Sequence, residues 1–359
     1  MLRGVAVLLV IAFHFRQYLN NVYSQVDFGN RLFGLGEVGV DIFFVISGFI
    51  ITYSTINKDR NTPVEFAIKR FFRLYPIFII TIMLLVVFDS TLQIQPSKLI
   101  KSLLVIPNDY NFIGPWYGYN INLPAWTLTY EILFYTFFGL AISISHKHRT
   151  LLAVIIIFSA CSAAQLYFRG FLQLDPITRD VNTNSVIRNF TFISNPIIYD
   201  FIYGMVIAEA YIRISKNKLD NIFFKVIFLI ALLMAMALIM SGYNKGAGVE
   251  RWGFYSFILI GSLVLLSKVI NIRYGRFWIL TGEMSYSLYI NHMIVKKLSG
   301  IYLHDLGIYK GNGGITLFII LFILTYLLSY VTYQLIEKPS VKIGHRLADY
   351  LRFKRLTSH

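Results

Sequence analysis

The segment IFFKVIFLIALLMAMALIMS, residues 222–241, decides the fold class of this chain. It contains one charged side chain, Lys225, which lies in the first turn. At about 1.5 Å per residue, a helix of this length spans about 30 Å, the thickness of the hydrocarbon core of a bilayer. The sequence therefore predicts a transmembrane helix here.

Similar apolar segments recur along the whole chain of 359 residues. Hydrophobic residues make up 56% of it and charged residues 14%, whereas soluble proteins have about 25% charged residues. The mean hydropathy is +0.62. Because the apolar runs are continuous rather than alternating, they exclude an outer-membrane barrel as well as a soluble domain. The predicted fold class is all-α, a polytopic membrane protein with about ten transmembrane helices, at residues 2–19, 38–57, 74–94, 124–145, 150–168, 194–214, 222–241, 252–270, 278–298 and 314–336.

The distribution of basic residues predicts the orientation of these spans. With the N-terminus inside, most of the 33 Lys and Arg residues fall on inner loops and the C-terminal end. By the positive-inside rule both termini are then cytoplasmic. This divides the chain into a transmembrane domain, 1–340, and a basic cytoplasmic tail, 341–359. We interpret the net charge of +15 as a topology signal and as an attraction to the lipid bilayer. No nucleic acid partner is expected.

Two prolines mark expected helix ends. Pro76 falls in the first turn of the predicted span 74–94, where a missing N–H group costs nothing. Pro339 follows the last predicted span, 314–336, and is expected to end it.

Several ionisable side chains fall inside the predicted spans, where they are costly and are functional candidates by default. They are His14, Asp41, Glu131, Asp200, Glu209, Glu283 and His292. Counted along each span in its predicted direction, five of them reach the outer half of the bilayer, namely His14, Asp41, Glu131, Asp200 and His292. The sequence favours a shared wet cavity. The alternative is that the carboxylates pair with the histidines only to hold helices together.

The inner side has a different chemistry. Arg70 and Arg73 lie one helical turn apart just before the predicted span 74–94, and Arg3 is at a similar depth. The planar guanidinium group suits phosphate recognition. The alternative is a plain basic anchor, with Tyr75 in the aromatic belt of the interface. No spacing of metal-ligating residues is present, so no metal is expected.

Six local strings together resemble the acyltransferase-3 family of bacterial membrane O-acyltransferases. They are LRGVA at 2–6 followed by His14, GVDIFFVISGF at 39–49, RFFRLYP at 70–76, WTLTYE at 126–131, SYSLY at 285–289 followed by His292, and EKP at 337–339. Each string alone is weak, but their order and spacing over nearly the whole chain make the resemblance specific. Two departures stand out: few residues precede Arg3, and about 20 follow the predicted last span. Some members of the family append an esterase-like domain, so this chain is expected to complete the transfer alone or with a separate partner.

The resemblance implies a multi-pass enzyme of the bacterial cytoplasmic (inner) membrane. It would transfer an acyl group, usually acetyl from acetyl-CoA, to a hydroxyl of a cell-surface or exported glycan, which can be lipid-linked. The family's essential arginine–histidine pair maps to Arg3 and His14, and its arginine pair to Arg70 and Arg73. The resulting candidates are, for catalysis, His14, Glu131 and Asp41; for donor binding, Arg3, Arg70 and Arg73; and for acceptor binding, Trp126, Tyr130 and His292.

The predicted depths and the resemblance suggest one mechanism. The polyanionic head of coenzyme A stays at the inner face, and its uncharged arm presents the thioester near His14. Neutral His14 then takes the hydroxyl proton, with Glu131 to orient it, or forms a transient acyl-enzyme. The alternative from another class is a proton-coupled transporter, in which the relay is His14, Glu131, Asp200 and His292.

Overall fold

The computed structural model describes residues 1–359 except 57–61, 93–94, 179–185, 272, 304–312 and 358–359, and the described part contains helices and no strand. This confirms an all-α polytopic membrane protein. The α-helices are α1 (Leu2–Phe15), α2 (Phe28–Phe33), α3 (Gly39–Ser54), α4 (Pro63–Phe88), α5 (Pro96–Leu103), α6 (Ala125–Ile144), α7 (Arg149–Arg169), α8 (Asp200–Arg213), α9 (Lys216–Leu219), α10 (Ile222–Ser241), α11 (Trp252–Ser267), α12 (Arg276–Glu283), α13 (Ser285–Tyr302), α14 (Gly314–Thr332) and α15 (Lys338–Thr357). Short 3-10 helices are η1 (Arg16–Leu19), η2 (Gly36–Val38), η4 (Val186–Ser194) and η5 (Pro196–Tyr199), and η6 (Tyr333–Glu337) is a π-helix.

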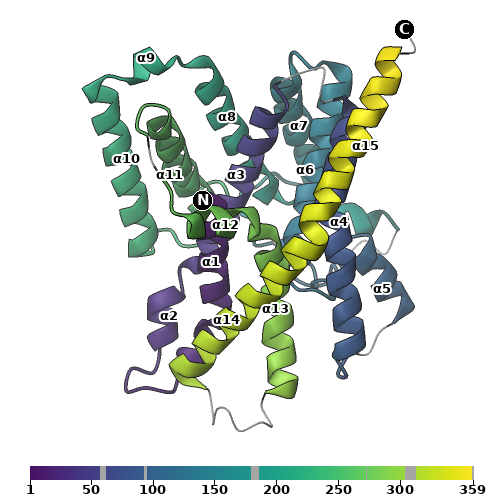
Figure 1. The fold of residues 1–359 in the computed structure, drawn as a ribbon, viewed down its shortest axis with the longest axis vertical. Coiled ribbons are helices and arrows are strands. Elements are labelled where there is room, and N and C mark those ends of the chain that lie inside the picture. The colour runs from purple at the N-terminus through teal and green to yellow at the C-terminus, as the bar shows by residue number, and fades with distance from the viewer. Residues whose placement is uncertain (57–61, 93–94, 179–185, 272, 304–312, 358–359) are drawn as a thin grey trace.

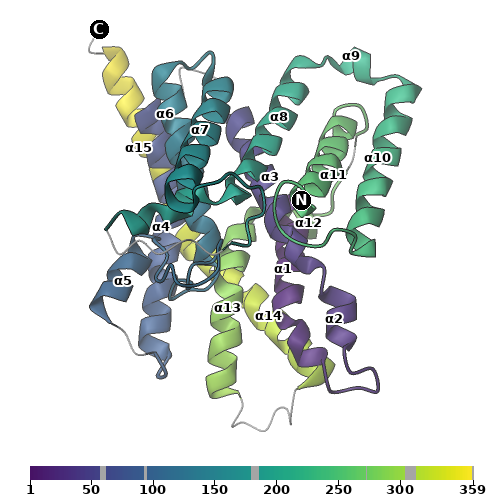
Figure 2. The same ribbon diagram turned by 180° about the vertical axis from the view of Figure 1, so that it is seen from behind.

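The helices form two groups around a central set. Figure 2 shows α8, α10 and α11 on one side and α4 to α7 on the other, with α1, α3 and α13 between them. In the described part, seven helices are long and apolar enough to cross a membrane, or eight if the pair η4 and η5–α8, bent by 46°, is one span. Helix α11 is shorter, and the predicted span 278–298 is interrupted between α12 and α13 at Met284. The count of ten spans and the cytoplasmic termini stay predictions.

Helix α4 begins earlier than the sequence analysis predicted. Pro63 occupies its first turn, and Thr62 and Glu65 form a capping box in which each side chain bonds the other's backbone N–H. Arg70 and Arg73 therefore lie inside α4 rather than before it. The prediction that Pro76 opens the span was wrong, because Pro76 lies in the helix interior.

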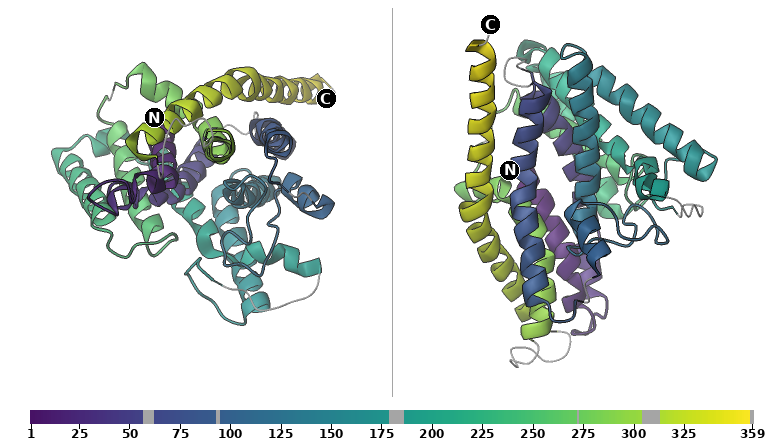
Figure 3. Two further views of the ribbon diagram at one scale, coloured as in Figure 1. Left: turned by 90° about the horizontal axis from the view of Figure 1, so that it is seen from below. Right: turned by 90° about the vertical axis from the view of Figure 1, so that its right-hand side faces the viewer.

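The last span does not end at Pro339. The π-turn η6 joins α14 directly to α15, and Pro339 lies in the first turn of α15, where its missing N–H is tolerated. Helix α15 continues to Thr357, and the boundary proposed at residue 340 falls inside it. Figure 3 shows α15 alongside α4, where Arg355 lies 3.5 Å from Glu65. The described part of the predicted tail is therefore a packed helix.

Glycines bring α3 and α8 into backbone contact. A methyl group at Gly48 would lie 2.1 Å from the carbonyl oxygen of Phe201, and one at Gly204 would lie 1.9 Å from that of Val45. Neither position can accept a side chain without moving backbone, as expected of small residues between membrane helices. The close crossing fixes the face that α3 turns toward α1, α6 and α13.

Candidate active site

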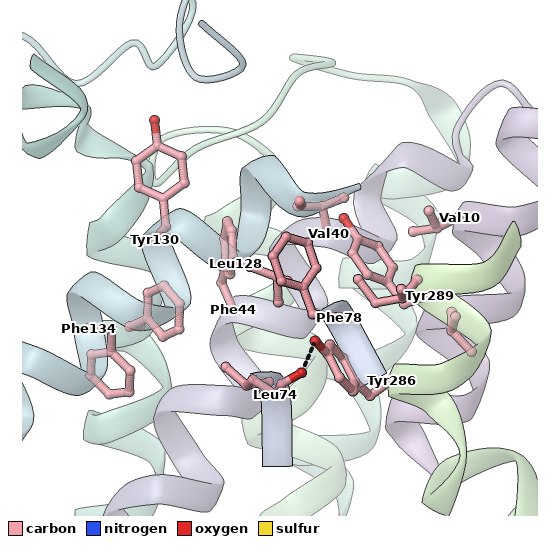
Figure 4. Packing of buried hydrophobic residues seen from close by; sticks show 14 of the residues in the cluster. Val10, Val40, Phe44, Leu74, Phe78, Leu128, Tyr130, Phe134, Tyr286 and Tyr289 are labelled. Atoms are coloured by element: carbon pink, nitrogen blue, oxygen red, sulfur yellow. Dashed lines mark hydrogen bonds between the residues drawn. The ribbon is translucent and has the colours of Figure 1, made fainter. Parts of the chain in front are cut away.

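A narrow cavity lies between α1, α3, α6 and α13. Figure 4 shows Val40, Phe44, Leu128, Tyr286 and Tyr289 around it. Its full lining is Arg3, Val40, Phe43, Phe44, Ser47, Thr127, Leu128, Glu131, Tyr286 and Tyr289. We call it the first cavity. It is apolar along most of its length and charged at Arg3 and Glu131, which suits a long ligand with few polar groups.

The charged end of the first cavity is held by aromatic contacts. The guanidinium carbon of Arg3 lies 5.8 Å from the centre of the Phe43 ring, and the hydroxyl of Tyr135 donates to Glu131. Glu131 and Arg73 both act electrostatically on Arg3. The Nε–H of Arg3 is buried and has no hydrogen-bond partner among the described residues. A buried donor of this kind is costly unless a ligand accepts from it.

A second charged hollow lies where α4, α12 and α15 meet. This donor cleft, as we name it, has an open volume of about 650 Å³ and is lined by Arg73, Gly282, Glu283, Tyr333, Glu337, Lys338, Val341 and Lys342. Its two carboxylates are already engaged, because Tyr333 donates to Glu283 at 3.0 Å and Ser287 donates to Glu337. Its three cations, Arg73, Lys338 and Lys342, outnumber these two carboxylates, so an anionic ligand can bind there.

Two histidines face each other beyond the apolar part of the first cavity. The ring centres of His14 on α1 and His292 on α13 are 5.1 Å apart. The Nδ1 of His292 lies 2.6 Å from the carbonyl oxygen of Tyr289. A carbonyl only accepts, so Nδ1 carries the proton and Nε2 keeps a lone pair. His292 is fully buried, whereas the His14 ring is partly open.

A larger cavity lies on the other side of the histidine pair. This second cavity has an open volume of about 1060 Å³. Its lining is Tyr18, Leu85, Leu92, Asn120, Ile121, Asn122, Leu123, Met293, Lys296, Lys297 and Gly300. Lys296 links it to the histidines, because its ammonium group donates to the carbonyl oxygen of His14 at 3.0 Å. Tyr289 links the pair to the first cavity, which it lines. Neither histidine lines the first or the second cavity itself, but through Tyr289 and Lys296 the pair is adjacent to both.

Arg3 and His14 lie on one helix, α1, near the donor cleft and the second cavity. This arrangement agrees with the family that the sequence resembles. Residues 1–334 match the family model of the acyltransferase-3 domain, described as an acyltransferase domain. The chain belongs to the acyltransferase-3 family. It is therefore a transferase.

Among curated acyltransferase-3 relatives, the chain is 24% identical to the O-acetyltransferase OatA of Staphylococcus aureus, over 99% of this chain and 58% of OatA. It is 27% identical to the exopolysaccharide production protein ExoZ of Rhizobium meliloti, over 50% of this chain and 53% of ExoZ. It is 29% identical to the acyltransferase MdmB of Streptomyces mycarofaciens, over 39% and 37%. The chain thus spans less than two thirds of each relative. No solved structure matches it significantly.

The structure separates the two arginines that the sequence analysis grouped together. Arg73 lines the donor cleft. Arg70 lies on a different groove, between α4 and α6, where its guanidinium carbon is 5.6 Å from the centre of the Tyr135 ring and its Nη2 donates to Ser54 at 3.3 Å. Through Tyr135, Arg70 reaches Glu131 indirectly. In this acyltransferase-3 domain the two arginines therefore have different surroundings, although they are one helical turn apart.

Neither aromatic residue predicted to bind the acceptor lines the first or the second cavity. Tyr130 is fully buried, and its hydroxyl donates to the carbonyl oxygen of Pro115 at 3.0 Å. Trp126 packs with its ring centre 6.3 Å from that of Trp116. Both side chains anchor the loop that precedes α6. They lie about 100° around α6 from Thr127 and Glu131, and both rings pack against Phe44, which lines the first cavity.

Asp41 also lies outside both cavities. Its Oδ1 accepts from the backbone N–H of Gly248 at 2.8 Å, and its carboxyl group lies against that of Asp200, with which it can share a proton. Both carboxyl groups are fully buried. A bond between two carboxyl groups needs a proton on one of them, because two adjacent carboxylates repel each other. The pair joins α3, α8 and the segment before α11, away from His14.

We expect Asp41→Asn to keep most of the transfer activity. Asparagine can still accept from Gly248, and its amide can donate to Asp200, as the shared proton does now. Asp41→Leu removes both bonds and leaves Asp200 buried alone, so the yield of folded protein should fall. The measurement is transfer from labelled acyl-CoA per folded molecule. If the Asp41→Asn protein folds and binds the donor but does not transfer the acyl group, Asp41 has a catalytic function after all.

The sequence analysis overlooked several residues of these sites. Lys296 lies in a predicted span and four residues after His292, which places both on one helix face. That spacing was a usable signal. Asn122 and Thr127 carry no comparable signal, because uncharged polar residues are common at helix ends. Lys338 and Lys342 were read as part of a basic tail.

Proposed function

We propose that this enzyme transfers an acetyl group from acetyl-CoA to a hydroxyl of a glycan on the outer side of the bacterial cytoplasmic membrane. The observation that carries the proposal is the histidine pair adjacent to two cavities, one with Arg3 and Glu131 at its charged end and the other larger and lined by two asparagines and two lysines. The name of the relative OatA, an O-acetyltransferase, supports acetyl as the acyl group, and that of ExoZ, an exopolysaccharide production protein, supports a glycan as the acceptor.

In this proposal the head of coenzyme A binds in the donor cleft. Arg73, Lys338 and Lys342 supply cations for its phosphates, and the guanidinium fork of Arg73 suits bidentate contact. The pantetheine arm then runs through the first cavity, where Arg3 can donate to one of its carbonyl groups. His14 lies 11 residues beyond Arg3 on α1, a rise of about 16 Å. Such a path brings the thioester to His14 while all charges stay at the inner end.

The chemistry uses the two imidazoles together. As the acceptor oxygen attacks the thioester carbonyl, His14 takes the hydroxyl proton, the new C–O bond forms and the C–S bond breaks. His14 then returns the proton to the departing thiolate, which leaves as the thiol of coenzyme A. The Nε2 lone pair of His292 can accept from the other ring nitrogen of His14 and hold it in the reactive tautomer, as the orienting member of a triad does. A transient acyl-His14 intermediate uses the same groups.

Glu131 has a different place in this scheme from the predicted one. Its contacts are with Tyr135 and the charge of Arg3, and no contact in the described part joins it to His14. We propose that Glu131 holds Arg3 and that His292 orients His14. Family membership decides against the transporter alternative, and the Asp200 of its relay is paired with Asp41.

The test compares the glycans of a deletion strain with those of its complemented strain by mass spectrometry. We expect the acetyl mass increment to be lost on deletion and restored by the parent gene, but not by one that encodes His14→Gln. In the same strain, reporter fusions to the C-terminus should report the cytoplasm. An unchanged acetyl content would refute the proposed function, and an external C-terminus would refute the proposed side for the donor.

A further inference from the structure

We infer that the second cavity binds the acceptor and selects a glycan that carries an anionic group, a carboxylate or a phosphate. The inference rests on the proposed function, since it names the substrate class of the same site. It is drawn from the size of the cavity, an unpartnered amide oxygen in it and an uncompensated cation at its edge.

Asn122 supplies a ready acceptor for a sugar hydroxyl. The residue is fully buried, and its Nδ2 donates to Thr81 at 3.2 Å and to the carbonyl oxygen of Ile290 at 3.3 Å. These two bonds fix the amide orientation. Its Oδ1 then faces away from both of these acceptors and has no hydrogen-bond partner in the part of the chain that the structure describes. A ligand hydroxyl would relieve the cost of this buried oxygen.

The charges around the second cavity do not balance. The two charged residues that line it are both lysines. Lys297 is paired with the buried carboxylate of Asp89. Lys296 is half-buried and donates to a neutral group, the carbonyl oxygen of His14, and no ion pair among the described residues includes it. Arg16 adds further positive potential at Lys296. A partly buried cation is favoured when an anion pairs with it.

The position of Lys296 gives the anion a function in catalysis. Lys296 is one helical turn from His292 on α13, about 5.4 Å along the axis, and touches the backbone of His14. An anionic substituent held at Lys296 places neighbouring hydroxyls of the same glycan beside the histidine pair. We therefore expect the acylated hydroxyl to lie on the anionic sugar or on the one next to it.

The experiment uses the full-length enzyme in lipid nanodiscs with labelled acetyl-CoA. Three acceptors of equal length are compared: an oligosaccharide with carboxylates, one with phosphate groups and a neutral one. We expect the parent to prefer one or both anionic acceptors, and the arm that responds identifies the anion. Lys296→Gln should raise the acceptor KM for that anion about 10- to 100-fold, the range for a lost charged hydrogen bond. Lys296→Arg should restore most of the preference.

The matched control is Lys101→Gln, because Lys101 also donates to a backbone carbonyl, that of Asn108, but does not line the second cavity. This variant should keep the parental preference. An equal loss of Lys296→Gln activity on neutral and anionic acceptors would reduce Lys296 to a support for His14 and overturn the inference. A parent enzyme that prefers the neutral acceptor would overturn it as well.

Two measurements without an acceptor, the binding of acetyl-CoA and the slow hydrolysis of acetyl-CoA, report on the donor site alone. If these are normal while charge selectivity is absent, only the inference fails. If the parent neither binds nor consumes acetyl-CoA, the proposed function fails first and the inference falls with it.

Discussion

Replacing His14 by glutamine lowers acyl transfer by about 10²- to 10⁴-fold, the contribution expected of a positioned general base. Glutamine is close in size and can hydrogen-bond, but it cannot take and return a proton. His14 is partly open and adjacent to the two cavities, so the replacement leaves the surrounding packing intact. The measurement is turnover of labelled acetyl-CoA with a glycan acceptor, normalised to folded protein. Binding of acetyl-CoA at the donor cleft should remain at the parental level.

His292→Gln is the comparison that separates the two imidazoles. His292 is buried behind His14 and orients it, so its loss should lower turnover by only about tenfold, as for one neutral hydrogen bond. The pH dependence of turnover should also change, because His14 would lose its fixed tautomer. If His14→Gln turned over at a near-parental rate while His292→Gln was inactive, the roles would be reversed and His292 would be the base.

Arg73→Ala should weaken acetyl-CoA binding by about 10- to 100-fold, because it removes a charged donor from the cleft. Lysine at this position should restore only part of the affinity, since it lacks the planar fork. The measurement is the Kd for acetyl-CoA on purified protein in nanodiscs. Membrane insertion should be unaffected, because α4 keeps its cap and its apolar face.

Two arginines serve as controls for Arg73. Arg346→Ala removes an exposed cation from α15 without touching the cleft lining, and it should leave the Kd unchanged. Arg70→Ala should change turnover more than affinity, because Arg70 contacts Tyr135 rather than the cleft. Parental affinity in Arg73→Ala would favour the alternative that this arginine only anchors α4 at the interface.

Depth in the membrane could be predicted from the sequence, but the direction of each side chain around its helix could not. His14 and His292 were expected at comparable depth, and the structure places them in ring contact. Asp41 also had a suitable depth, yet its side chain turns away from the first cavity toward Gly248. Successive residues of a helix point about 100° apart, so the direction in which a side chain points is settled only by how the helix packs. For α3, this direction is fixed by the close contact with α8 at Gly48 and Gly204.

Helix ends show a second limit of the sequence. The start of α4 at Pro63 could have been predicted, because Thr62 and Glu65 have the spacing of a capping box. It was missed because the apolar run, from which the span was predicted, begins later. The continuation through Pro339 was not readable, since a proline after an apolar span ordinarily ends a helix. The π-turn at 333–337 that carries the chain past it depends on tertiary contacts of Tyr333 and Glu337.

The layer that Tyr289 forms between the first cavity and the histidines has a consequence for the energy metabolism of the cell. Its hydroxyl is 3.0 Å from that of Thr127, and its backbone carbonyl holds His292. An acyl group is uncharged and can be handed across such a layer, whereas a hydrated ion would have to shed its water at great cost. Under the proposed function, with the donor and the acceptor on opposite sides of the membrane, such a layer would let the enzyme work without dissipating the proton gradient. Electrical insulation thus accompanies catalysis, and the same tyrosine contributes to both.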